Sequence, residues 1–208
     1  MTTLAEMRTR VRDFVRDTNA DETKRKVSDA ELNGYLQDGL SDYSWHFPLQ
    51  KVADTSPPVT LPADAVPDEN AVDFVEVSGV LWTLYKVEEG SSLPTTGKFW
   101  YWRGGSIELA PTPTSSVSVW YRALHPFPAE DADFTLPSAD EELLVLYTAA
   151  KFHQKVGTVA AKLDRFKERG ERDDNPLIMM HQVIMAEYHA KVSDRLRKGT
   201  VRLRKTNA

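Results

Sequence analysis

The stretch V-S-D-A-E-L-N-G-Y-L-Q-D-G-L-S-D-Y-S-W-H-F-P, residues 27–48, decides the fold class, because it starts like a helix and ends in aromatic residues before a proline. Ser28 and Glu31 have the spacing of a capping box, in which two side chains satisfy the first free N–H groups of a helix. Leucines and tyrosines then recur every three or four residues, the period of an amphipathic helix. Pro48 ends the pattern, since the residue before a proline disfavours the helical conformation. We therefore predict a helix over about residues 28–47.

Helical patterns occur at both ends of the chain. With the stretch above, they predict helices over about residues 3–18, 28–47, 138–157, 158–171 and 175–198. Capping boxes open three of these helices, at Thr3–Glu6, Ser28–Glu31 and Ser138–Glu141. The buried stripe expected for the last helix consists of Leu177, Met180, Ile184, Tyr188, Val192 and Leu196. After Gly199, apolar and polar residues alternate as in a strand, so an extended C-terminal tail is expected.

The middle of the chain has the composition of a sheet. Residues 52–137 hold ten of the twelve prolines and four of the five tryptophans, and they show no sustained helical period. Short runs rich in β-branched and aromatic residues predict antiparallel strands at 59–61, 71–87 (two strands), 98–103, 106–110 and 116–123. Gly104-Gly105 is the strongest hairpin signal.

These patterns predict an α+β protein. We expect a bundle of about four helices, formed by residues 1–51 and 138–198, with a β-rich antiparallel insertion at 52–137 and an extended tail at 199–208. At 208 residues the chain is long enough for one core or for one domain that carries an insertion.

Charge is unevenly distributed along the chain. Residues 1–51 carry 8 basic and 9 acidic side chains, residues 52–137 carry 4 and 12, and residues 138–208 carry 14 and 10. Between Lys191 and Lys205 there are seven cations and one anion. Such a block is typical of a solvated helix end or tail, and it also fits contact with a partner or with nucleic acid.

Motifs for catalysis or for a cofactor are not found. The chain has no cysteine, no metal-binding pair of histidines at helical spacing, no G-x-S-x-G, no P-loop and no G-x-G-x-x-G. The aromatic run 99–103, with Trp82 and Trp120, fits a stacking platform for sugars or single-stranded nucleic acid, but the acidic surroundings favour a core. We expect no enzyme activity, no metal and no cofactor.

The order of several segments resembles a known family. These segments are V-S-D-A-E-L-N-G-Y-L-Q-D-G-L, T-L-P-A-D, G-G-S-I-E-L-A-P-T-P, S-V-W-Y-R-A-L-H-P-F and E-L-L-V-L-Y-T-A-A-K-F. In this order and spacing, over about residues 4–195, the chain resembles the head-to-tail connector (adaptor) proteins of tailed bacteriophages, the group that includes tail tubular protein A.

The resemblance implies a structural virion protein at the head-to-tail junction. It implies a ring of about twelve copies that docks under the portal protein, contacts a downstream tail or neck protein, and lets genomic DNA pass through its lumen without sequence-specific binding. It also implies synthesis in the cytoplasm of the bacterial host, consistent with the absence of a signal-peptide pattern and of a membrane-spanning apolar run.

Site residues follow from this resemblance. The family's carboxy-terminal segment reaches the portal, which makes the portal-contacting candidates Thr200, Val201, Arg202, Leu203, Arg204 and Lys205. A ring subunit needs two complementary faces for its neighbours, and the candidates for this subunit interface are Gly34, Gly39, Tyr43 and Trp45. The alternative functions are a tail-associated carbohydrate-binding module that uses the tryptophans and a small cell-wall-degrading enzyme.

Overall fold

The computed structural model describes residues 2–66, 71–86, 96–103, 106–163 and 176–205. The chain forms two compact units, a helical unit (residues 1–46 and 125–208) and a sheet unit (residues 47–124). Four α-helices and a six-stranded mixed sheet confirm the predicted α+β class.

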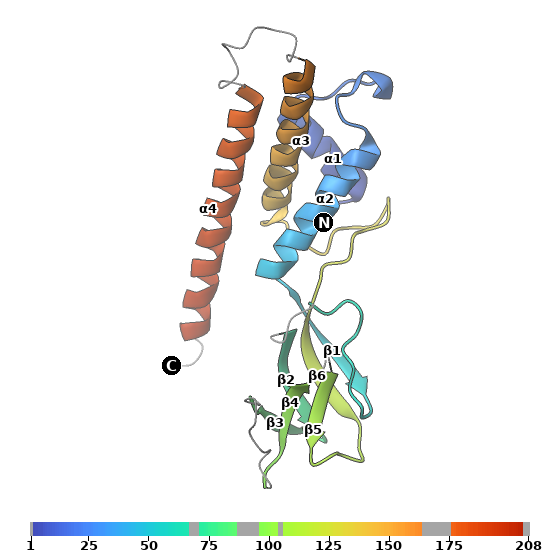
Figure 1. Cartoon of the computed structure of the whole chain (residues 1–208), viewed down its shortest axis with the longest axis vertical. Helices are drawn as coiled ribbons and strands as arrows, with labels where there is room; N and C mark the ends of the chain where they lie inside the picture. Colours follow the sequence, from blue (N-terminus) through green and yellow to red (C-terminus); the bar gives the residue numbers. More distant parts are fainter. Residues whose placement is uncertain (1, 67–70, 87–95, 104–105, 164–175, 206–208) are drawn as a thin grey trace. The chain divides into compact units, whose positions relative to one another are not determined.

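The helical unit is built around one central helix (Figure 1). Its helices are α1 (Leu4–Val15), α2 (Asp29–His46), α3 (Glu141–Leu163) and α4 (Pro176–Lys205), with a short 3-10 helix η1 (Glu22–Lys24) between the first two. The central helix α3 contacts each of the other three α-helices. The largest fully buried side chains include Met7, Leu32, Leu36, Leu40, Leu144, Leu146, Phe152 and Tyr188.

Two predicted capping boxes are present in the structure. Thr3 and Glu6 exchange hydrogen bonds at the start of α1, and Ser28 and Glu31 do so at the start of α2. At the start of α3, the carboxylate of Glu141 is instead hydrogen-bonded to Arg10 of α1. At the start of α3, a contact between two helices therefore takes the place of the predicted capping box.

Gly157 does not interrupt α3, contrary to the sequence prediction. It lies inside one continuous helix, and an added Cβ there would be 3.2 Å from Leu177 Cβ and 3.2 Å from Ile178 Cγ1. Close approach of α4 therefore explains this glycine. Of the helix expected at 158–171, the residues after Leu163 lie outside the described residues.

The C-terminal segment 200–205 was expected to be extended, but α4 continues through Lys205. The alternation of apolar and polar residues after Gly199 therefore does not indicate a strand in this segment. Adding a residue to an existing helix forms one hydrogen bond for each residue fixed, whereas a strand needs a partner for its backbone groups.

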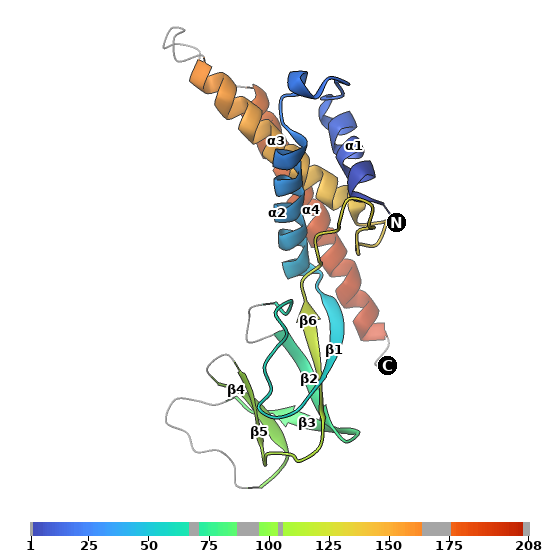
Figure 2. The same cartoon turned by 90° about the vertical axis from the view of Figure 1, so that its right-hand side faces the viewer.

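The sheet unit contains one sheet with the strand order β1-β6-β2-β3-β4-β5 (Figure 2). Its strands are β1 (Leu49–Thr55), β2 (Val72–Val77), β3 (Val80–Leu84), β4 (Phe99–Arg103), β5 (Ser106–Ala110) and β6 (Val117–Ala123). All neighbouring pairs are antiparallel except β3 and β4, which pair in parallel. A parallel pair needs a long connection, and residues 85–98 supply one.

The turn between β2 and β3 has a clear physical basis. Val77 pairs with Val80, and the two residues between them, Ser78 and Gly79, have φ angles of 52° and 78°. Two positive φ angles define a type I′ turn, whose twist matches that of the flanking strands. The predicted hairpin glycines at 104–105 lie outside the described residues, but the strands on either side pair antiparallel, with Arg103 opposite Ser106.

Two details of the predicted strands differ from the structure. Strand β1 was not expected, because residues up to 51 were assigned to the helical part of the chain. Leu49–Thr55 nevertheless alternates between half-buried and exposed residues, as a strand does. The expected strand at 59–61 is reduced to an isolated bridge between Val59 and Ile107. Residues 71–87, 98–103, 106–110 and 116–123 contain the remaining five strands.

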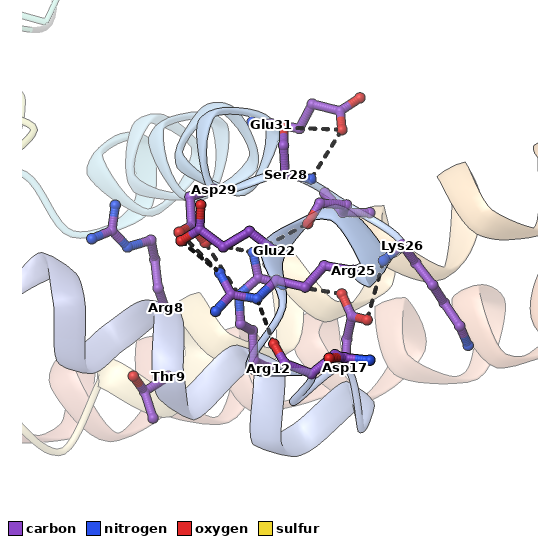
Figure 3. A network of polar contacts seen from close by, with 12 residues as sticks. Arg8, Thr9, Arg12, Asp17, Glu22, Arg25, Lys26, Ser28, Asp29 and Glu31 are labelled. Atoms are coloured by element: carbon purple, nitrogen blue, oxygen red, sulfur yellow. Dashed lines mark hydrogen bonds and ion pairs between the residues drawn. The ribbon is translucent and has the colours of Figure 1, made fainter.

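A buried arginine connects α1 to the start of α2 (Figure 3). The Arg12 guanidinium donates hydrogen bonds to Asp17 Oδ2 at 3.0 Å, to the Val27 carbonyl at 3.1 Å and to Asp29 Oδ1. The side chains of Arg12 and Asp17 are 8% and 4% exposed. Arg25 also contacts Asp29, with a distance of 3.2 Å between Nη1 and Oδ2. Charges this deeply buried are tolerated only when they are paired and hydrogen-bonded.

The same cluster shifts the ionisation of Asp29. Burial raises the pKa of this carboxyl, but the hydrogen bond and charge of Arg12, together with the charge of Arg25, outweigh burial and hold the pKa below its usual value. Because the folded state favours the ionised form, Asp29 stabilises the fold above the unfolded-state pKa, and this stabilisation is lost as pH falls through the folded-state pKa.

The two glycines of α2 are expected to respond oppositely to alanine. A Cβ at Gly39 would lie 2.8 Å from Leu144 Cδ1 and 2.8 Å from Tyr147 Cδ1, whereas a Cβ at Gly34 meets nothing within 4 Å. Gly39→Ala is expected to destabilise the protein by about 1–3 kcal/mol through overpacking. Gly34→Ala is expected to stabilise it by up to about 1 kcal/mol through helix propensity. Urea unfolding of both variants measures this, and equal effects would contradict the packing at Gly39.

Removal of the buried arginine is expected to be costly. Arg12→Ala leaves Asp17 buried without its partner, so we expect a loss of about 3–5 kcal/mol in the free energy of unfolding. Lys24→Ala is the matched control, because its pair with Asp21 is exposed, and such pairs contribute at most about 1 kcal/mol. Thermal unfolding of the two variants measures the difference, and a similar small effect for both would refute a structural role for Arg12.

Acid unfolding tests the Asp29 ion pairs. At pH 7 we expect Asp29→Asn to be less stable than the original protein. We expect the difference to shrink as pH falls below about 4, because the unfolded chain then binds a proton at Asp29 that the folded protein takes up only at lower pH. Urea midpoints measured from pH 7 to pH 3 give the two curves. A difference that is independent of pH would show that the ion pairs do not act through charge.

Candidate assembly surfaces

Two of the four residues predicted for a subunit interface are buried inside the helical unit. Gly39 is buried where α2 approaches Leu144 and Tyr147 of α3. Tyr43 is also buried, and its hydroxyl donates a 2.7 Å hydrogen bond to Asp140 Oδ2. In this fold, both residues serve packing within one subunit.

The other two residues face solvent. Gly34 is exposed in α2, with no atom within 4 Å of an added Cβ, and Trp45 is 50% exposed near the end of the same helix. An exposed tryptophan offers a large apolar area to a partner. The subunit-interface prediction therefore rests on Gly34 and Trp45.

A buried junction joins α2, the start of α3 and α4. Asp140, immediately before α3, accepts the Tyr43 hydrogen bond and lies 3.0 Å from Arg195 Nε of α4. Burial, together with the hydrogen bond to Asp140, raises the pKa of the Tyr43 hydroxyl, so it remains a protonated donor. Tyr188 of α4 donates in the same way to Asp42 of α2. These contacts fix the rotation of α4 about its own axis and hence the face that it presents outward.

Helix α4 buries a narrower stripe than the sequence predicts. Ile184, Tyr188 and Val192 are buried, but Met180 and Leu196 of the expected stripe are exposed. Met179 and Val183 are exposed as well, and Val183 is 63% exposed. Sequence reasoning missed this second row, although apolar or small residues recur at 179, 183, 186 and 190 with helical spacing.

The C-terminal part of α4 is strongly basic. Among the described side chains of α4, Val192 is the last buried one. From Arg195 to Lys205 the chain has six cations and no acid. The predicted portal-contacting residues Thr200–Lys205 form the end of this helix. The basic residues up to Lys205 therefore belong to the helix α4.

Helix α2 has the opposite charge. It contains four carboxylates, Asp29, Glu31, Asp38 and Asp42, and no lysine or arginine. Three of them have partners within the helical unit, namely Arg12 and Arg25 for Asp29, Lys155 for Glu31 and Tyr188 for Asp42. Asp38 forms no ion pair with another residue that the structure describes.

The aromatic residues of the sheet unit are mainly core residues. Trp82, Phe99, Trp100 and Tyr101 are buried, and Trp102 is partly buried against the same core. Trp120 stacks on Phe74 with ring centroids 4.9 Å apart. This arrangement favours the core interpretation over a sugar-binding platform built from the run 99–103.

The part of the chain that the structure describes contains neither a cluster of metal-binding side chains nor a candidate membrane span. There, no three or more histidine or acidic side chains are grouped so that they could hold a metal ion. In the same residues, no helix has the length and apolarity required to span a bilayer.

Comparison with known families places the chain in one of them. The family model described as SU10 adaptor protein matches residues 2–180, which include the sheet unit, α1, α2, α3 and the start of α4. No curated protein matches the chain. The family match confirms the resemblance inferred from the order of the sequence segments. The chain therefore belongs to the SU10 adaptor protein family, a phage head-tail adaptor family, and it is a structural protein of the virion.

Proposed function

We propose that this adaptor docks under the portal protein as a ring of about twelve identical copies, made in the cytoplasm of the bacterial host, and links the capsid to the tail. Family membership supports a role among the head and tail proteins of a phage. A ring of identical copies also fits a chain that exposes apolar residues on α2 and α4, since closed rings need two different complementary faces on each copy.

The observation that carries the portal contact is the basic end of α4. Beyond Val192 no described side chain of this helix is buried, while the cations continue to Lys205. A helix segment that buries none of its described side chains and carries excess positive charge is suited to an acidic surface of another protein. We assign portal contact to residues 200–205 on this basis.

The sheet unit is proposed to contact the downstream tail or neck protein. It folds around its own core, which includes Val75, Trp100, Val119 and Tyr121, so it does not depend on the helical unit for burial of its apolar residues. A compact unit with its own core is suited to a second set of contacts within one assembly.

Passage of genomic DNA through the lumen needs weak, sequence-independent contact. The two helical segments, residues 1–51 and 138–208, together carry 22 basic and 19 acidic side chains, so the two signs nearly balance. A surface with this balance releases few counterions when DNA approaches and does not hold the DNA tightly. The proposed lumen therefore lets DNA pass without sequence-specific binding.

Truncation tests the portal contact. A chain ending at Lys198 is expected to fold normally, because it keeps the last buried described side chain of α4, Val192, and to lose docking on portal rings. A chain ending at Lys205 is the control and should dock like the full-length protein. Circular dichroism checks the fold, and electron microscopy of mixtures with the portal measures docking. Normal docking of the chain that ends at Lys198 would disprove the assignment.

A further inference from the structure

The outward side of α4 carries an apolar row that is exposed among the residues that the structure describes. Met179, Val183, Ala186 and Ala190 are all exposed, and they lie on the side of the helix opposite Ile184, Tyr188 and Val192. We call these four residues, with Arg197, the α4 outer face. Arg197 follows Ala190 by seven residues, two helical turns, and forms no ion pair with another described residue.

A complementary surface lies on α2 of the same helical unit. Gly34, Asp38, Ser41 and Trp45 recur with helical spacing, and all four are exposed. We call them the α2 outer face. Its middle is free of bulky side chains, its end offers the exposed indole of Trp45, and its carboxylate, Asp38, forms no ion pair with a described residue.

The α4 outer face and the α2 outer face do not contact each other within one chain. Helices α2 and α4 both contact α3 with their buried faces, and the buried Tyr188 of α4 also reaches Asp42 of α2, so the two outer faces point away from these contacts (Figure 1). The apolar row with Arg197 therefore faces away from the surface with Asp38, and neither of these two side chains is in an ion pair with a described residue. Two different, complementary faces on one subunit are what a head-to-tail contact between identical copies requires.

We infer that the α4 outer face of one copy packs on the α2 outer face of the next copy, with Arg197 beside Asp38. This contact rests on the proposed ring and specifies which surfaces close it. In this contact the exposed apolar row of α4 binds a second copy of this chain and not the portal or the tail.

One register of this contact brings the two charges together. Helices α2 and α4 run in the same direction in both views, and rotation about an axis along them keeps the neighbour's helices parallel to them (Figures 1 and 2). If Ala190 of one copy lies against Gly34 of the next, Arg197 lies three residues beyond Asp38, about 4.5 Å along the helix. An arginine side chain spans that offset.

Charge reversal tests the pairing. Asp38→Arg and Arg197→Glu each place like charges together at every contact of the ring, so each single variant should assemble at least about tenfold more weakly with the portal. The double variant D38R/R197E restores opposite charges and should recover assembly. Assembly is measured by sedimentation and by electron microscopy of portal mixtures, and circular dichroism verifies folding of all three variants.

Val183→Asp tests the apolar row independently of the ion pair. Val183 is 63% exposed, so this change should leave the fold intact and abolish assembly of copies. Leu81→Asp in the sheet unit is the matched control, because Leu81 is also 63% exposed, and it should keep ring assembly.

The outcomes separate this inference from the proposed function. If the unmodified protein forms rings on the portal and V183D and both single charge reversals assemble as well as it does, the inferred interface is wrong while the proposed function stands. If V183D keeps its rings but loses a different virion protein, the α4 outer face receives that protein, and the inference is again wrong. If the unmodified protein does not assemble with the portal, the proposed function and the interface fail together.

Discussion

The helical unit depends on the packing of three helices against α3. Gly39 allows α2 to lie against Leu144 and Tyr147, and Gly157 allows α4 to approach α3 from another direction. Asp140, just before α3, then holds Tyr43 of α2 and Arg195 of α4 at the same carboxylate. Because these contacts fix how α2 and α4 are rotated, they also decide which residues the subunit presents to its partners.

Local signals predicted the elements well, because capping and helical period depend on near neighbours in sequence. Thr3–Glu6 and Ser28–Glu31 cap their helices as expected, and β6 buries Val117, Val119 and Tyr121 on one face. Errors arose where distant contacts decide the outcome. Gly157 was predicted to end a helix, but it lies where α4 packs closely against α3. Glu141 was predicted to form a capping box with Ser138, but its carboxylate is hydrogen-bonded to Arg10.

The candidate surfaces were less predictable, since a residue type does not show which side of a helix faces the core. Gly39 and Gly34 are both glycines in one helix, yet only Gly39 is packed against another element. Met180 fitted the expected buried stripe of α4 and is exposed. Resemblance to the adaptor family indicated that exposed surfaces would exist, but the rotation of α4, set by Tyr188 and Arg195, was needed to locate them.

The central claim is that identical copies of this structural protein surround the DNA path between capsid and tail. Electron cryomicroscopy of the intact virion tests it most directly, because the two folded units can be fitted separately into a map of the head-tail junction. The account predicts a closed ring of this chain directly beneath the portal, with its helices in the ring wall. Density for this chain elsewhere in the particle, or a single copy at the junction, would contradict it.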